Sequence, residues 1–291
     1  MVAWLLAGLL LCSPVLAVTP DAVETWDTGA TESWVRWDPL NQAPSSVSNP
    51  TNYLRAVFGS QTMSVPQMHI LRADTNASSG VFVGDYWDAA ITNATFDLYC
   101  ESHIPKQLSL YFYGAGRWWG SYLPLPGGTG WTHYDVPVRH GSDWRFGGEV
   151  SAEFKAAMKA VEWIGLVIER NVSLDSQAYG LDNFSLHGAS DLVDTDEDGM
   201  TDWAEFIAGT LDGDSNSVFA AELGLTNAPS GFVLMWASAA DRVYGVNVST
   251  NLAAGFVPEA GGITATPPVN VYIDADATNG GPYFYEIEVE E

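Results

Sequence analysis

Short runs of alternating apolar and polar residues dominate the first two thirds of the chain. Phe96, Leu98 and Cys100 share one face of such a run, because successive side chains of a strand point to opposite faces. Residues that favour turns, mainly Gly, Pro, Ser and Asn, separate the runs. The pattern predicts ten strands, at residues 33–37, 53–58, 68–73, 80–84, 95–100, 108–114, 118–123, 133–138, 163–170 and 180–186.

One segment of this region has a helical period instead. Between Ser151 and Val161, the apolar residues Phe154, Ala157 and Met158 recur at a spacing that would place them on one face of a helix. Ten short strands with a single helix favour an all-β fold, a β-sandwich of jelly-roll type over residues 18–189.

The charge of the chain changes near residue 190. The net charge is −25, and residues 171–291 contain twenty acidic residues with Arg242 as the only base. We expect an acidic connector at 190–217, followed by a small C-terminal β-sandwich at 218–291 with four or five strands. Its clearest predicted strands are residues 232–238, 242–249, 270–275 and 283–290.

The connector contains a twelve-residue pattern of oxygen ligands, DTDEDGMTDWAE, that is typical of a calcium loop of the EF-hand type. A glycine at the sixth position allows the sharp turn of such a loop, and carboxylates stand at the positions that bind the ion. The predicted Ca²⁺ ligands are Asp194, Asp196 and Asp198 at positions 1, 3 and 5, the Met200 carbonyl at 7, Asp202 through water at 9, and bidentate Glu205 at 12. A solvated acidic linker is the alternative interpretation.

After the loop, residues 201–208 should form a helix with Trp203, Phe206 and Ile207 on one face and Gly209 at its end. A strand, not a helix, precedes the loop, so the pattern predicts half of an EF-hand. The loop resembles those of dockerins and thrombospondin type 3 repeats, which implies a structural calcium. From the loop to the closing PYFYEIEVE, the chain also resembles a C-terminal arrangement of exported proteins of Verrucomicrobia and related planctomycete-group bacteria.

Residues 1–17 have an apolar run followed by small residues, which predicts a signal peptide cleaved before Val18, although the usual basic residue is missing from its start. We therefore expect a secreted or cell-surface protein, or a periplasmic one. No other segment is apolar enough to span a membrane. The strong negative charge makes nucleic acid an improbable partner. Cys100 would be the only cysteine of the processed chain, most simply a buried one.

The region 20–188 is similar to the galactose-binding-like jelly rolls of carbohydrate-binding modules. Val23-Glu24, Gly29 and Trp34 near its start carry the resemblance, together with the run GLDNFSL at residues 180–186. In that family an early Glu and an Asp of the last strand often hold a structural calcium. The resemblance therefore implies Glu24 and Asp182 as ligands of a second metal; a structural Asp182 that only accepts hydrogen bonds is equally compatible with the sequence.

A glycan or another cell-surface polymer is the expected partner, with Arg117, Trp118 and Trp119 as the first candidates to bind it and Trp131 and Trp144 as the next. Adjacent tryptophans on a strand point to opposite faces, so one of Trp118 and Trp119 should be core. A purely structural or adhesive role is the first alternative. No catalytic motif is present, so an enzyme such as a glycoside hydrolase or polysaccharide lyase is a second, weaker one.

Overall fold

The computed structural model describes residues 18–38, 43–45, 47–62, 67–138, 144–145, 151–189, 193–224, 231–277 and 281–290. The predicted signal peptide at 1–17 lies outside the described residues. Within these ranges, no helix is both long and apolar enough to cross a membrane.

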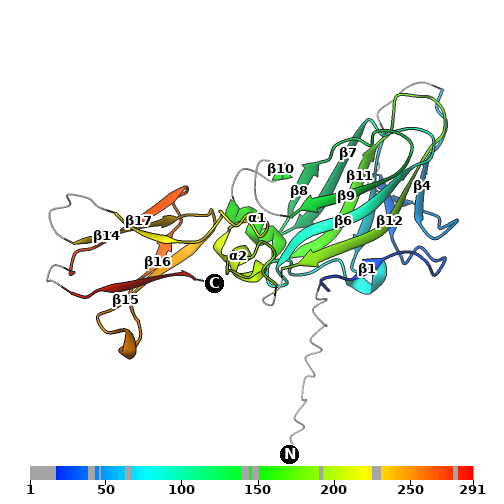
Figure 1. The fold of residues 1–291 in the computed structure, drawn as a ribbon. Helices are drawn as coiled ribbons and strands as arrows, with labels where there is room; N and C mark the ends of the chain where they lie inside the picture. Colours follow the sequence, from blue (N-terminus) through cyan, green and yellow to red (C-terminus); the bar gives the residue numbers. More distant parts are fainter. Residues whose placement is uncertain are drawn as a thin grey trace, which may run out of the picture.

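The first sheet of the large sandwich is antiparallel and has its two longest strands at its centre (Figure 1). Strand β12 (Gln177–Gly188) pairs with β6 (Ile91–Cys100) on one side, and β6 pairs with β9 (Gly130–Pro137) at the edge. On its other side, β12 pairs first with β4 (Leu54–Phe58) and then with β1 (Val23–Glu24).

The second sheet is also antiparallel, in the order β10-β8-β7-β11-β5-β2-β3. Its strands are β2 (Val35–Asp38), β3 (Ala43–Ser45), β5 (Met68–Asp74), β7 (Gln107–Gly114), β8 (Arg117–Tyr122), β10 (Trp144–Arg145) and β11 (Val161–Glu169). The two sheets enclose one large core, in which Phe96, Leu98 and Cys100 of the first sheet and Leu108, Leu110 and Phe112 of the second are buried. The alternation in the sequence therefore predicted the inward faces correctly.

Two of the predicted elements differ from the structure. The predicted strand 80–84 forms only an isolated bridge at Gly84, after the short 3₁₀ helix η1 (Ala77–Gly80). The predicted helix 151–161 ends early: α1 covers Ser151–Met158, and Val161 begins β11, where it pairs with Gly114. Both errors have the same cause, because tertiary packing decides how a short apolar run folds.

The C-terminal part consists of two small antiparallel sheets, and both differ from the large sandwich in size. One has the order β13-β14-β17 and the other β16-β15-β18. The strands are β13 (Ala221–Gly224), β14 (Phe232–Ala237), β15 (Val243–Ser249), β16 (Val257–Thr264), β17 (Val269–Asp274) and β18 (Phe284–Glu290), with the 3₁₀ helix η2 (Leu252–Ala254) after β15. Leu234, Trp236, Tyr244 and Val246 form the small core between these sheets. The sequence pattern predicted four of these strands and missed β13 and β16.

Helix α2 (Asp202–Ala208) lies between the large sandwich and the small sheets, close to α1 (Figure 1). Its ends follow the sequence signals. The side chain of Thr201 accepts a hydrogen bond from the Ala204 N–H as the N-cap, and Gly209 ends the helix with a left-handed φ of 82°. The fold therefore places the predicted calcium loop at the junction of the two β parts.

Candidate metal centre and ligand-binding faces

The predicted calcium loop is built by its own backbone hydrogen bonds. Gly199, at the sixth position, has a φ of 100°, which side-chain-bearing residues rarely adopt. The Gly199 N–H donates to Asp194 at 2.9 Å, the Asp198 N–H to Asp196 at 3.2 Å, and the Met200 N–H to Asp198 at 2.8 Å. Each of these aspartates therefore uses one carboxylate oxygen to shape the loop.

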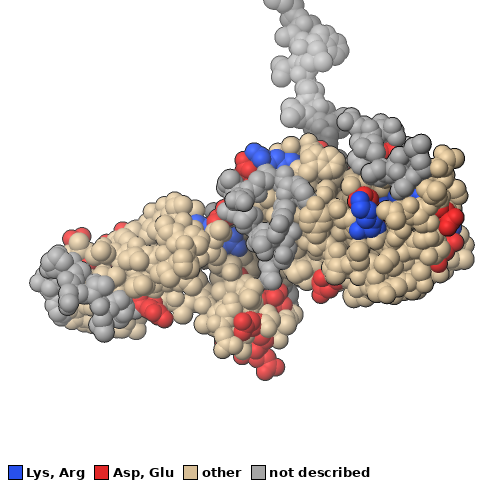
Figure 2. Space-filling model, turned by 90° about the horizontal axis from the view of Figure 1, so that it is seen from above, with Lys and Arg blue, Asp and Glu red and all other residues tan. Residues whose placement is uncertain are grey.

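The carboxylates of the same three residues converge. One ligand atom from each of Asp194, Asp196 and Asp198 lies within 4.8 Å of the other two. Figure 2 shows acidic side chains gathered on the part of the molecule between the large sandwich and the small sheets. Among the described residues, five carboxylate oxygens of the loop are buried without a hydrogen-bond partner: Asp194 Oδ1, Asp196 Oδ2, Asp198 Oδ2, and both Oε atoms of Glu205.

Among the described residues of the loop, Glu205 is the most deeply buried carboxylate. Its side chain, in the first turn of α2, is fully buried. Burial raises the pKa of its carboxyl, and the negative charges of Asp196 and Asp198 raise it further, against a lowering by the nearby Thr210 hydroxyl. Burial also raises the pKa of Asp196, and the negative charges of Asp198 and Asp194 raise it further. Carboxylates packed this closely repel each other unless a cation or a proton compensates their charge.

The donor set fits calcium in type and number. Three monodentate aspartates and a bidentate Glu205 provide five oxygens, and the predicted carbonyl of Met200 would be a sixth, which reaches the six to eight that Ca²⁺ takes. Asp202 is used differently in the structure: its carboxylate accepts hydrogen bonds from the N–H and the hydroxyl of Thr195, both at 2.9 Å. Asp202 therefore stabilises the loop through Thr195. Its predicted contact with the ion through water stays a prediction.

The second predicted metal pair, Glu24 and Asp182, lies near the meeting point of β1 and β12. The Glu24 carboxylate accepts hydrogen bonds from the Trp26 N–H at 3.0 Å and from the Ser78 hydroxyl at 2.5 Å. Burial raises the pKa of Asp182, and Asp97, Asp27 and Glu24 contribute further repulsion. Among the described residues, no third Asp, Glu, His or Cys joins this pair within ligand distance. A metal held by Glu24 and Asp182 therefore stays a prediction.

The structure distinguishes the two adjacent tryptophans of β8. Trp119 is fully buried and packs edge-on against Phe154, with ring centroids 5.0 Å apart. Its ring cannot stack on a ligand, so the prediction narrows to Trp118, which is 41% exposed. Trp118 packs against Trp163 at 4.7 Å, on the outer face of the second sheet. Arg117, beside it, forms an ion pair with Glu153 at 2.5 Å.

Trp144 is buried in the large core and donates its indole N–H to the Pro137 carbonyl at 2.6 Å, so it is not a platform for a ligand. Trp131, in contrast, is 49% exposed on β9. The neighbouring segment His133–Asp135 alternates as the sequence predicts. His133 and Asp135 are exposed, whereas Tyr134 points inward and stacks on Phe96 with centroids 5.1 Å apart.

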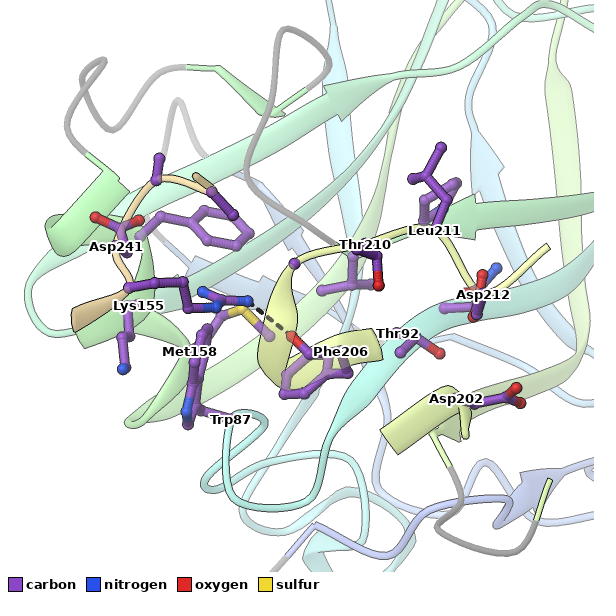
Figure 3. Close-up of a pocket in the computed structure, with 18 residues that line it drawn as sticks. Trp87, Thr92, Lys155, Met158, Asp202, Phe206, Thr210, Leu211, Asp212 and Asp241 are labelled. Atoms are coloured by element: carbon purple, nitrogen blue, oxygen red, sulfur yellow. Dashed lines mark hydrogen bonds between the residues drawn. The ribbon is translucent and has the colours of Figure 1, made fainter. Parts of the chain in front are cut away.

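Sequence reasoning missed the contacts that tie α2 to both β parts (Figure 3). Arg242, in the turn before β15, donates to the carbonyl oxygens of Ile207 at 2.6 Å and of Phe206 at 2.7 Å. Its guanidinium also lies 4.7 Å from the ring of Trp87, a residue of the large sandwich. The Phe206 ring packs on Trp87 as well, with centroids 5.2 Å apart. A single arginine therefore contacts the connector helix and the large sandwich at once.

A cavity of about 410 Å³ lies at this junction, between α1, α2 and the turn at residues 239–242. Lys155 of α1 lies over the same Trp87 ring at 4.2 Å. Burial lowers the pKa of Lys155, and the positive charges of Arg242 and Lys159 lower it further. The one signal that could have indicated this junction was Arg242 itself, the only base among 121 residues from 171 to 291.

No protein-family model matches the chain, and a search of curated proteins finds no match either. Solved structures similar to it include the L4b domain of human laminin alpha-2, with a TM-score of 0.43 and 11% identity over 59% of this chain and 98% of that one. A family 11 carbohydrate-binding module from Clostridium thermocellum, in complex with a β-1,3-1,4-mixed-linked tetrasaccharide, has a TM-score of 0.36 and 12% identity over 56% of this chain and 92% of that one.

The N-terminal cellulose-binding domain of a Cellulomonas fimi β-1,4-glucanase has a TM-score of 0.36 and 13% identity over 60% of this chain and 100% of that one. At these identities and TM-scores, the likeness assigns neither a ligand nor an activity to this chain.

Proposed function

We propose that this protein is an exported, non-catalytic calcium-binding β protein, in which one Ca²⁺ fixes the connection between a large jelly-roll module and a small C-terminal β module. The ion would be held by Asp194, Asp196, Asp198 and Glu205, with the Met200 carbonyl as a further ligand. In this role calcium is structural, and it supplies positive charge where the chain gathers carboxylates.

The observation that carries this proposal is the state of Glu205. A fully buried carboxylate is costly when neither oxygen has a hydrogen bond of normal geometry, by about 1–3 kcal/mol or more for each unsatisfied charged group, and the nearby Thr210 hydroxyl would offset only part of this. The unpartnered oxygens of three aspartates gather in the same loop. A solvated acidic linker, the alternative, would turn these oxygens outward to water.

Helix α2 would transmit the effect of calcium to the two modules. Glu205 sits in α2 beside Phe206, whose ring packs on Trp87 of the large sandwich. The carbonyl end of the same helix accepts both hydrogen bonds from Arg242 of the C-terminal part. A cation at the end of a helix is favoured by the helix dipole, typically by about 0.3–1 kcal/mol. Ordering of the loop by calcium would therefore order the contacts on both sides of the helix.

Calorimetric titration of the intact chain with Ca²⁺ tests the proposal through a pair of charge-matched variants. Glu205→Gln removes one negative charge and the bidentate ligand, so we expect calcium uptake to be lost. Glu197→Gln removes the same charge from the same loop, at an exposed position that is no predicted ligand. It should weaken binding only slightly. Equal weakening by both variants would indicate diffuse attraction of the ion to negative charge and would refute the site.

A second candidate function is glycan binding by the large module, favoured by the exposure of Trp118. An exposed indole held by its neighbours is a ready platform for the apolar face of a sugar ring. Arg117, the other predicted contact, precedes Trp118 on β8 and therefore points to the opposite face, where it pairs with Glu153. Trp118→Ala should then weaken binding of a glycan selected on an array, with an unchanged far-ultraviolet circular dichroism spectrum. Affinity that does not change in this variant would remove Trp118 from the site, and failure of the wild-type chain to bind any glycan would favour the structural role.

A further inference from the structure

The edge strand β9 presents a line of three exposed side chains, Trp131, His133 and Asp135. The residues between them, Thr132 and Tyr134, point to the other face of the strand. At 3.3–3.4 Å per residue, neighbours in this line are roughly 7 Å apart. An aromatic ring is thus followed directly by two polar groups on the outer face of the first sheet.

Two tyrosines support the indole of Trp131. Its ring centroid lies 4.9 Å from that of Tyr99 on β6 and 5.5 Å from that of Tyr53, at an interplanar angle of 90° to the latter. Gly180 of β12 gives this cluster its room, because a Cβ at that position would lie 2.6 Å from the Tyr53 ring. The cluster holds Trp131 in place while half of its surface remains exposed.

The polar groups beside this cluster are held in place as well. Asp97 of β6 pairs directly with His133, and its carboxylate contacts His133 Nδ1 at 2.8 Å. Its other oxygen accepts a hydrogen bond from the Asn183 side-chain amide, also at 2.8 Å. A carboxylate only accepts hydrogen bonds, so Nδ1 is the donor and Nε2 of the exposed imidazole is directed away from Asp97.

Asn183 stands at an irregularity of β12, where the pairing with β6 shifts between Asp182 and Ser185. Its φ is 51°, in the left-handed region that residues other than glycine adopt at an energetic cost. Bulges of this kind re-aim side chains and are over-represented beside binding sites. Here the bulge directs the Asn183 amide onto Asp97, on the exposed face.

We propose that this surface, the Trp131 face, binds a neutral glycan. The Trp131 face consists of Tyr53, Asp97, Tyr99, Trp131, His133, Asp135 and Asn183. A sugar ring would stack its C–H face on Trp131, and the hydroxyls of the same or the next sugar would bond to His133 and Asp135. This inference deepens the glycan-binding part of the proposed function, and it locates the ligand on the opposite sheet from Trp118.

The charges of the Trp131 face select the class of glycan. The carboxylates of Asp97 and Asp135 lie on it, Asp182 is near by, and Arg55, next to the cluster, is already paired with Glu101 at 2.7 Å. The chain as a whole carries a net charge of −25. Carboxylates accept hydrogen bonds from hydroxyl groups but repel uronates and sulfates, particularly at low salt. The ligand should therefore be an uncharged oligosaccharide.

The surroundings of Trp118 differ from those of Trp131 in the polar groups that are available to hydrogen-bond the hydroxyls of a sugar. Beside it, Trp163, Val167 and Ile70 form a buried apolar cluster on the outer face of the second sheet. The guanidinium of Arg72, which lies over the Trp163 ring, is already paired with Asp74 at 3.0 Å. The Trp131 face joins an equally exposed indole to side chains that can donate and accept hydrogen bonds. It therefore meets both requirements of a sugar site.

The test compares Trp131→Ala and His133→Ala with Trp118→Ala, which removes the indole of the alternative glycan site on the other sheet, all in the full chain with calcium present. An array of neutral and uronate-containing oligosaccharides selects the tightest neutral probe, and calorimetry with that probe measures affinity. Trp131→Ala should weaken binding at least tenfold, and His133→Ala at least threefold. If the Trp131 face is the site, Trp118→Ala should change affinity by less than twofold, whereas a site at Trp118 predicts the opposite pattern. Uronate oligosaccharides should bind more weakly than neutral ones. On titration with the probe, the Trp131 indole N–H signal should shift in the ¹H–¹⁵N spectrum.

Unchanged affinity in Trp131→Ala, or preferred binding of the uronate probes, would overturn this inference. Loss of affinity in Trp118→Ala alone would leave the module a glycan binder but move the site to the other sheet. If no oligosaccharide binds the wild-type chain, both glycan proposals fail, whereas the calcium titration of the same sample reports separately on the connector.

Discussion

The guanidinium of Arg242 donates a hydrogen bond to the carbonyl oxygen of Phe206 at 2.7 Å, and so joins the C-terminal β part to the last turn of the connector helix. The side chain of Phe206 and the guanidinium of Arg242 both pack on Trp87. The connector helix, the small sheets and the large sandwich thus meet at one tryptophan. Because Glu205 precedes Phe206 in the same helix, the calcium loop and this junction are mechanically linked.

Removal of the Arg242 side-chain charge should separate the two β parts. We expect Arg242→Met to destabilise the junction by about 2 kcal/mol, because two carbonyls at the end of α2 lose a charged donor. In calorimetry with calcium, the C-terminal part should then unfold at a lower temperature than the large sandwich. Arg55→Met, which breaks only a surface ion pair, should change the scan by about 1 kcal/mol or less. Coincident, unshifted unfolding in Arg242→Met would show that the arginine does not join the parts.

The two tryptophans of β8 should differ sharply in their effect on stability. Trp119→Ala leaves a large cavity in the core and should lower the free energy of unfolding by about 3–5 kcal/mol. Trp118→Ala, at an exposed site, should lower it by about 1 kcal/mol or less. Urea denaturation followed by circular dichroism measures both values. A comparable loss in the two variants would contradict the orientation of β8.

Mild acid should destabilise the large sandwich through His69. Burial, together with the positive charge of Arg36, lowers the pKa of His69 to about 4, against 6.5 for the unperturbed group. Between pH 4 and 6.5, His69 is therefore mainly protonated in the unfolded chain and mainly neutral in the folded chain. Stability is full above pH 6.5 and falls as the pH drops toward 4.

The side chain of His69 is only partly buried, so this loss should be about 1–2 kcal/mol, less than the full shift would give. Urea denaturation at pH 7.5 and pH 5 without calcium measures it, with His69→Gln as the reference. The wild type should lose more stability than the variant between the two pH values. Equal losses would mean that His69 titrates normally in the folded protein.

Local chemistry was predictable from the sequence, and contacts between distant segments were not. The loop turn at Gly199 and the end of α2 at Gly209 follow from backbone preferences, and the structure agrees with them; Thr201, predicted as the first helical residue, is the N-cap instead. The contact of Arg242 with Trp87 joins residues 155 positions apart, and no periodicity encodes it. Helix α1 ended early for a similar reason, because Val161 is recruited as a strand by pairing with Gly114.

The ligand-binding faces show the same limit. Alternation indicated that one of Trp118 and Trp119 would be exposed, but it could not say which, because the inward face of β8 depends on its register with β7. The sequence made Trp131 a weaker candidate for ligand binding than these two residues, because it does not show that Tyr53, Asp97 and Tyr99 lie beside it. Cys100, in contrast, followed the simple expectation: it is buried, and burial raises its pKa to about 11.

The central claim, that calcium in the Asp194–Glu205 loop orders the junction, is tested most directly by calorimetric titration of the intact wild-type chain with Ca²⁺, paired with limited proteolysis. We predict uptake of one ion with a dissociation constant no weaker than about 10⁻³ M, the upper range for extracellular modules. At a hundredfold excess this stabilises the ordered connector by about 2.7 kcal/mol, so calcium should protect residues 193–217 from cleavage, and chelator should expose them while both β parts stay folded. No calcium uptake near millimolar concentration, or cleavage of the connector at the same rate with and without the ion, would contradict the account.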